Sequence, residues 1–129
     1  MIHQPSALRD PTDEERAFCE AYREAHKDEA IGQVADTLLY EDEKVKIWQM
    51  TLAPGEASDL HHHAYDYYLC ISSGDKIAGV MREEDGGTIF ASDLPEQGNT
   101  IPVKKGRTEW AVNIGSVTYR EVLIELKDS

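Results

Sequence analysis

The chain has 129 residues, of which 40% are hydrophobic and 29% are charged, a composition typical of one soluble globular domain. Asp and Glu outnumber Lys and Arg by 25 to 13, so the formal net charge is -12 and no basic surface is expected for nucleic acid or for an anionic membrane. The chain has no apolar run near the roughly 20 residues of a spanning helix and no signal-peptide core, so we expect a cytoplasmic protein without a nucleic-acid or membrane partner.

The first predicted element is a helix over roughly residues 13–28. Thr12 is a good N-cap residue, and Glu15 follows it at the spacing of a capping box. A narrow apolar stripe runs along this helix and consists of Phe18, Ala21, Tyr22 and Ala25. The stripe predicts that the helix lies on a surface or packs against a partner subunit.

From residue 35 onward the hydrophobic period changes to two. Short runs rich in Val, Ile, Thr, Tyr and Trp then follow one another, over residues 35–41, 44–52, 60–71, 76–81, 87–91, 100–103, 108–114 and 117–126. Turn sequences separate them, and Asp85-Gly86-Gly87 is expected to form a tight hairpin connection. Short strands at regular spacing indicate an all-β sandwich or barrel. We therefore expect an N-terminal helical arm over 1–34 and a β domain over 35–129.

Three of the five histidines are consecutive, and they lie in a run with strand character. Side chains alternate between the two faces of a strand, so His61 and His63 point the same way and His62 points the opposite way. Two imidazoles on one face can converge on a metal ion. A pair of hydrogen-bonded core histidines and an exposed polar patch are the alternatives.

The surroundings of these histidines resemble the first cupin motif, G-x5-H-x-H-x3-E-x6-G. Gly55, His61, His63 and Gly74 occupy its positions at the required intervals, and Tyr67 stands where the motif has Glu. The resemblance extends over residues 35–127. It implies a double-stranded β-helix, the cupin jelly-roll barrel, preceded here by an α-helix and with a small-molecule site in the barrel mouth.

The second cupin motif, G-x5-P-x-G-x2-H-x3-N, is matched in part. Gly98, Gly106 and Asn113 lie at the correct intervals, whereas Lys104 replaces the Pro and Glu109 replaces the His. We expect the glycines and the asparagine to serve turns and strand ends. Three segments, over 45–56, 61–68 and 110–127, are also similar to short single-domain cupins found with amino-acid and β-alanine degradation genes.

The ligand set that the resemblance implies departs from the family pattern. The remaining histidines, His3 and His26, lie in the arm, so His61, His63 and Glu109 are the metal ligands that the resemblance leaves. Two imidazoles and a carboxylate suit one divalent ion, which is Fe, Zn, Mn, Ni or Co. Glu109 is alternatively a general base in a site without metal.

Tyr67 lies on the face of His61 and His63 by the same alternation. It either packs and hydrogen-bonds, or binds the metal as a phenolate, or acts as a catalytic acid or base. Asp66, Tyr68 and Cys70 are expected on the opposite face, so Asp66 does not replace the missing Glu ligand.

Several functions are compatible with this pattern. The favoured one is a metal-dependent enzyme acting on a small organic acid or amino-acid-derived metabolite, as an oxygenase with redox-active iron or as a lyase or isomerase with a redox-inert ion. The alternatives are a sensor or accessory protein that binds a ligand or metal without catalysis, and a metal-free cupin. A homodimer is also expected, because cupins commonly pair through barrel faces.

Overall fold

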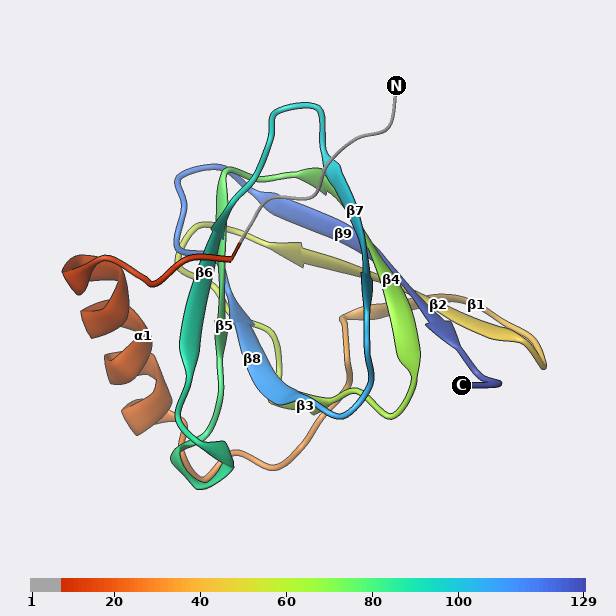
Figure 1. The fold of residues 1–129 in the computed structure, drawn as a ribbon, viewed down its shortest axis with the longest axis horizontal. Helices are drawn as coiled ribbons and strands as arrows, with labels where there is room; N and C mark the ends of the chain where they lie inside the picture. Colours follow the sequence, from red (N-terminus) through yellow and green to blue (C-terminus); the bar gives the residue numbers. More distant parts are fainter. Residues whose placement is uncertain (1–7) are drawn as a thin grey trace.

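The computed structural model describes residues 8–129, so His3 and the first seven residues of the predicted arm lie outside the described part. Within it the chain forms a helix α1 (Asp13–Ala25), a short 3-10 helix η1 (Glu83–Asp85) and nine strands (Figure 1). The strands are β1 (Thr37–Glu41), β2 (Val45–Leu52), β3 (His61–His62), β4 (Asp66–Ser73), β5 (Lys76–Val80), β6 (Ile89–Asp93), β7 (Asn99–Val103), β8 (Thr108–Val112) and β9 (Tyr119–Leu126). The predicted all-β fold with an N-terminal helix is confirmed, and the boundary at residue 34 stays a prediction.

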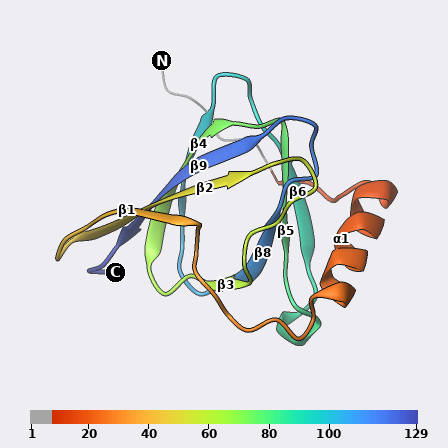
Figure 2. The same cartoon turned by 180° about the vertical axis from the view of Figure 1, so that it is seen from behind.

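The strands form two antiparallel sheets that face each other. One has five strands in the order β1-β2-β9-β4-β7, and the other has four in the order β3-β8-β5-β6. Strands far apart in the sequence are neighbours, as in a jelly roll, and β2 pairs with β9 along its whole length. The β1–β2 hairpin and the end of β9 extend beyond the barrel in both views (Figures 1 and 2).

The strand predicted over residues 60–71 is two strands in the structure. β3 pairs with β8 in the four-stranded sheet, whereas β4 pairs with β7 and β9 in the five-stranded sheet. The chain crosses between the sheets over residues 63–65. At the start of this crossing the backbone N–H of His63 still donates to Arg107 O at 3.0 Å. The alternation of inward and outward side chains therefore continues from β3 to β4, although the two strands belong to different sheets.

The connection predicted as a tight hairpin at Asp85-Gly86-Gly87 is longer than expected. It contains η1 followed by Gly86 and Gly87, whose φ angles of 104° and 70° favour glycine. Arg23 of α1 fills this loop, and its Nη1 donates to Met81 O at 3.0 Å and to Gly87 O at 2.9 Å. The extra residues thus provide carbonyl groups that attach the helix.

The predicted capping box is present at the start of α1. Glu15 N–H donates to Thr12 Oγ1 at 3.1 Å, and Thr12 N–H donates to the Glu15 carboxylate at 2.9 Å. The helix ends at Ala25 rather than near residue 28. His26 is the C-cap, and its ring Nδ1 donates to Tyr22 O at 2.8 Å, which closes the last turn.

α1 lies on the surface of the barrel, which is one of the two arrangements that its apolar stripe predicted. Cys19 and Arg23 are buried, whereas Phe18 of the predicted stripe is 45% exposed. The buried face of α1 packs on the outer face of the four-stranded sheet, where Cys19 joins a cluster with Val80 and Trp110. The arm therefore covers the outer face of its own barrel at β5 and β8.

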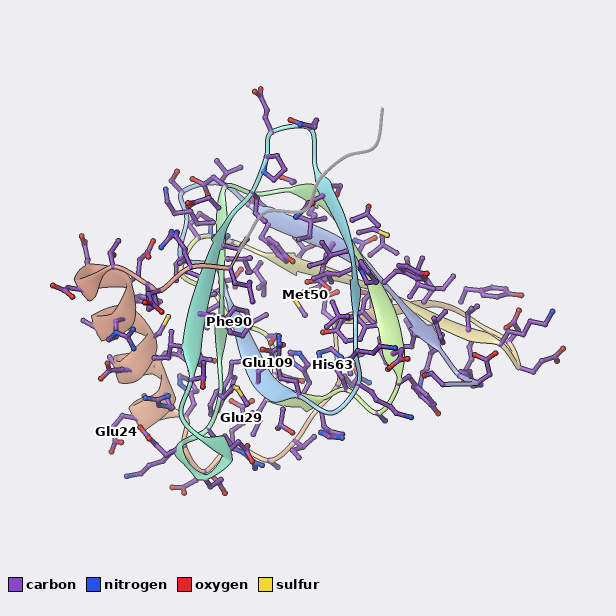
Figure 3. The ribbon with its side chains drawn as sticks, viewed as in Figure 1. Glu24, Glu29, Met50, His63, Phe90 and Glu109 are labelled. Atoms are coloured by element: carbon purple, nitrogen blue, oxygen red, sulfur yellow. The ribbon has the colours of Figure 1, made fainter. Side chains whose placement is uncertain are left out.

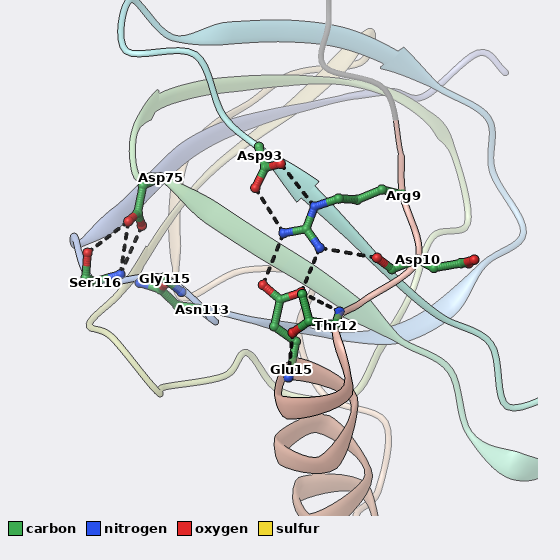
Figure 4. Close-up of polar contacts among 9 residues, drawn as sticks. All are labelled: Arg9, Asp10, Thr12, Glu15, Asp75, Asp93, Asn113, Gly115 and Ser116. Atoms are coloured by element: carbon green, nitrogen blue, oxygen red, sulfur yellow. Dashed lines mark hydrogen bonds and ion pairs between the residues drawn. The ribbon is translucent and has the colours of Figure 1, made fainter.

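Arg9 fastens the start of α1 to β6 (Figure 4). Its Nη1 lies 2.7 Å from Glu15 Oε1, and its Nη2 lies 2.9 Å from Asp93 Oδ1. The hydrogen bond from Arg9, with help from Thr12, lowers the pKa of Glu15 from 4.5 to about 2.

Glu15→Gln is expected to lower the free energy of unfolding at pH 7 by about 1 kcal/mol, because it removes the charge that Arg9 binds with two hydrogen bonds. The pKa is lowered in the folded state, so this stabilisation is complete above about pH 4.5 and is lost as the pH falls toward 2. Urea unfolding of both proteins across this range measures the difference, with the exposed neighbour variant Glu14→Gln as control. A difference that stays constant with pH would contradict the assignment.

Candidate metal centre

The three predicted ligand residues come together inside the barrel. His61 of β3 pairs directly with Glu109 of β8, and His63 follows at the end of β3. One ligand atom from each residue lies within 4.8 Å of the other two. The residues are buried, with exposed fractions of 2%, 2% and 7% for His61, His63 and Glu109. Figure 3 shows His63 and Glu109 at the interior of the barrel.

Both histidines are in the form that binds a metal. His61 Nδ1 lies 2.8 Å from Asp59 O. A carbonyl oxygen only accepts, so Nδ1 carries the proton and Nε2 keeps its lone pair. Burial lowers the pKa of His61, and burial together with the neighbouring His61 lowers the pKa of His63 to about 3. Both rings are therefore neutral near pH 7.

Glu109 contributes a buried carboxylate. Its Oε1 lies 3.8 Å from His63 Nε2, and its Oε2 lies 3.9 Å from Arg107 Nη1. Burial raises the pKa of Glu109 to about 7, against the opposing effect of Arg107. Glu109 Oε2 and His63 Nδ1 have no hydrogen-bond partner among the described residues. A divalent ion would compensate the Glu109 carboxylate, so the three residues fit a metal and can hold one.

The neighbouring residues lie outside this cluster, as the alternation predicted. His62 is exposed, and its Nδ1 lies 2.8 Å from Thr108 Oγ1. Asp66 accepts a hydrogen bond from the backbone N–H of Lys105 at 3.0 Å. Asp66 is therefore engaged with the loop before β8 and does not replace the missing Glu ligand.

Tyr67 reaches the cluster from the other sheet. It is buried on β4, and its ring stacks on His63 with the centroids 4.1 Å apart. Burial and the charge of Glu109 raise the pKa of Tyr67 well above its usual value, so the phenol keeps its proton near pH 7. Its predicted catalytic role stays a prediction.

A cavity of about 320 Å³ adjoins the cluster and lies between the two sheets. His61, His63 and Glu109 line it, but most of its wall is apolar and includes Met50, Ile71, Phe90, Ile101 and Leu123. Met50 and Phe90 appear around the interior in Figure 3. The volume is at the lower end of the range for small-molecule sites.

Phe90 and Arg107 form one side of this cavity. A Cβ atom at Gly79 would collide with the Phe90 ring, so the glycine makes room for this ring on β5. The Arg107 guanidinium lies over the same ring, 4.8 Å from its centroid. The stacking holds a positive charge beside the metal cluster.

No protein-family model matches the chain, and no curated protein matches it. Solved structures do match. A cupin domain from Bordetella pertussis Tohama I has a TM-score of 0.59 at 21% identity, over 74% of this chain and 99% of that chain. An RmlC-like cupin family protein with a double-stranded β-helix fold, from Methanocaldococcus jannaschii, has a TM-score of 0.54 at 17% identity, over 98% of this chain and 92% of that chain. The chain has the cupin fold.

The cupin fold is also shared with the polyketide cyclase RemF from Streptomyces resistomycificus, at a TM-score of 0.52 and 14% identity, over 79% of this chain and 76% of that chain. Likeness at these identities establishes the cupin fold alone. The similarity to cupins of amino-acid degradation therefore stays a prediction. None of the helices in the described part of the chain is long and apolar enough to cross a membrane.

Asn113 has the structural role in this cupin barrel that its motif position predicted. It is fully buried, and its side-chain amide donates to Leu52 O and to Val117 O at 3.0 Å each. Its Oδ1 accepts from the backbone N–H of Gly115 at 2.9 Å. Asn113 thus shapes the end of β8 and does not line the cavity beside the metal cluster.

Sequence reasoning missed four cavity residues of this cupin barrel: Phe90, Asn99, Arg107 and Glu121. A signal existed for two of them. Arg107 lies two residues before Glu109, and Glu121 has the same parity as the buried Tyr119 and Leu123 of β9. Alternation alone would have placed both with the inward residues.

Proposed function

We propose that the chain is a metal-dependent enzyme acting on a small organic acid or amino-acid-derived metabolite, with one divalent ion held by His61, His63 and Glu109. The observation that carries this proposal is the convergence of two neutral imidazoles and a buried carboxylate at the wall of a mainly apolar cavity. Such a cavity excludes water and leaves the metal side accessible to a small ligand. A named enzyme, RemF, is among the proteins with the same fold.

Arg107 is the group that would bind the substrate carboxylate. It lines the cavity, and its guanidinium stacks on the Phe90 ring. Glu109 is its near neighbour at 3.9 Å. A carboxylate engaged with a metal leaves the planar guanidinium available to pair with an acid in the cavity.

The bound ion, which is Fe, Zn, Mn, Ni or Co, would supply oxygenation chemistry if it is iron and Lewis-acid chemistry if it is redox-inert. We place the oxygenase first and the lyase or isomerase second. Tyr67 supports either reaction as a buried, protonated phenol beside His63, from which it can donate a hydrogen bond to the substrate.

A binding protein without metal or catalysis is the second candidate. It is favoured by Arg107, because a cation 3.9 Å from Glu109 Oε2 partly compensates this carboxylate without any metal. The site would then bind a small acid and release it unchanged.

Elemental analysis separates the two candidates. Protein purified without a His-tag and without chelator is expected to contain close to one equivalent of a transition metal per chain. Folded protein that takes up less than about a tenth of an equivalent after incubation with each of the five ions would support the metal-free candidate instead.

A homodimer is proposed on the outer face of the five-stranded sheet. Tyr40 of β1 and Tyr68 of β4 are large and exposed there, and they lie on the same rung through Ile47 and Ile124. Light scattering is expected to give twice the mass of one chain, and Tyr68→Lys should shift the protein toward the monomer. A monomer at high concentration would contradict the dimer.

A further inference from the structure

Two polar side chains face the cavity from the sheet opposite the metal cluster. Glu121 of β9 and Asn99 of β7 both pair with Ile71 of β4, so they lie on the same rung of the five-stranded sheet, one on each side of Ile71. They are buried, with exposed fractions of 4% and 5%, and both line the cavity.

Each of these side chains has an oxygen atom without a partner. Glu121 Oε1 accepts from the Tyr119 hydroxyl at 2.7 Å, but Glu121 Oε2 and Asn99 Oδ1 accept no hydrogen bond from the described residues. A buried acceptor normally has a hydrogen-bond donor, and the described residues supply none to these two oxygens. The two acceptor oxygens on this rung are therefore suited to bind a hydrogen-bond donor in the cavity.

A second buried glutamate on the same strand shows that β9 can satisfy such a group internally. Glu125 is equally buried, and it accepts from Trp48 Nε1 at 2.7 Å. Glu125 is not among the residues that line the cavity. The folded chain supplies Glu125 with a hydrogen-bond donor, whereas Glu121 Oε2 has no donor among the described residues and lies at the cavity wall.

We infer that Glu121 and Asn99 form a subsite for an amino group of the substrate. This inference rests on the proposed function, in that the cavity binds a small molecule. A carboxylate and an amide oxygen both accept, and a carboxylate favours a cationic donor, so an ammonium group suits the pair. Arg107 lies in the loop before β8 of the other sheet and suits a carboxylate. The substrate class is therefore an amino acid with both groups ionised.

The test compares pairs of ligands of equal shape by isothermal titration calorimetry on the intact, metal-analysed protein. The pairs are α-aminobutyrate with α-methylbutyrate, γ-aminobutyrate with pentanoate, and δ-aminovalerate with hexanoate, in which a methyl group replaces the ammonium. Wild type is expected to bind the amino member of at least one pair about tenfold or more tightly than its isostere. Glu121→Gln should abolish this preference, and Glu125→Gln should keep it.

Asn99→Leu provides a second test of the subsite, which does not depend on whether the Glu121 variant folds. It should weaken binding of the preferred amino ligand severalfold and leave its isostere unaffected. A wild type without preference in all three pairs, or a preference that survives in both Glu121→Gln and Asn99→Leu, would overturn the subsite. Metal uptake reports on the proposed function separately: a preference in protein that takes up none of the five ions would keep the subsite and reject the metal enzyme.

Discussion

Replacing His61 or His63 with alanine is expected to lower the metal affinity of the protein at least about tenfold, since even partners outside the ligand shell contribute about 10- to 100-fold. Both rings are buried beside Glu109, and each provides one of the three converging ligand atoms. Elemental analysis after dialysis against a weak chelator measures the loss. Circular dichroism of each variant shows that the barrel is still folded.

His62→Ala is the matched control, because it removes an identical side chain from the position between the two ligands. His62 is exposed and contacts Thr108, so its loss should leave metal content at the wild-type level. Equal loss from all three alanine variants would show that the assigned strand faces are wrong.

The second large effect is expected at Glu109. Glu109→Gln keeps the shape of the side chain but removes its charge, and should lower metal affinity at least about tenfold. Glu109→His restores the commoner cupin ligand and should stay close to wild type. Competition with a fluorescent chelator gives the three affinities in order.

Two results would change the role of Glu109. A Gln variant that binds metal as tightly as wild type but loses turnover would make Glu109 a general base. A Gln variant unchanged in both respects would reject the ligand set of two histidines and one carboxylate. Glu125→Gln, a buried carboxylate outside the cavity, controls for the loss of a buried charge as such.

Much of the fold followed from local patterns, because turns and strand periods depend on residues close in sequence. Thr12 and Glu15 identified the start of α1, and the eight predicted runs all contain strands. The crossing at residues 63–65 was missed because both sheets face the same interior, so the period of two continues when the chain changes sheets. The burial of Arg23 on α1 was not predicted, because it depends on hydrogen bonds to a distant loop, which hydrophobic spacing does not report.

The residues of the candidate site were predictable where they belong to one strand or to one sequence motif. His61 and His63 share a face through alternation, and the motif spacing brought Glu109 to them. Glu121 and Asn99 were missed because their meeting depends on the order β9-β4-β7, which pairs both with Ile71. Arg107, in the loop before β8, stacks on Phe90 of β6. These two residues are distant in sequence, so no local pattern predicts their contact.

The arm contacts the residues next to two of the candidate ligands. Glu29 Oε2 accepts from the backbone N–H of Leu60, immediately before His61, at 2.6 Å. Tyr22 meets Trp110, immediately after Glu109, with ring centroids 6.2 Å apart. Glu29 and Tyr22 do not line the cavity, but changes at either residue would disturb the backbone or the ring next to a candidate ligand. Trimming the chain to residues 35–129 for crystallisation or biotechnology would, for the same reason, alter ligand geometry as well as stability.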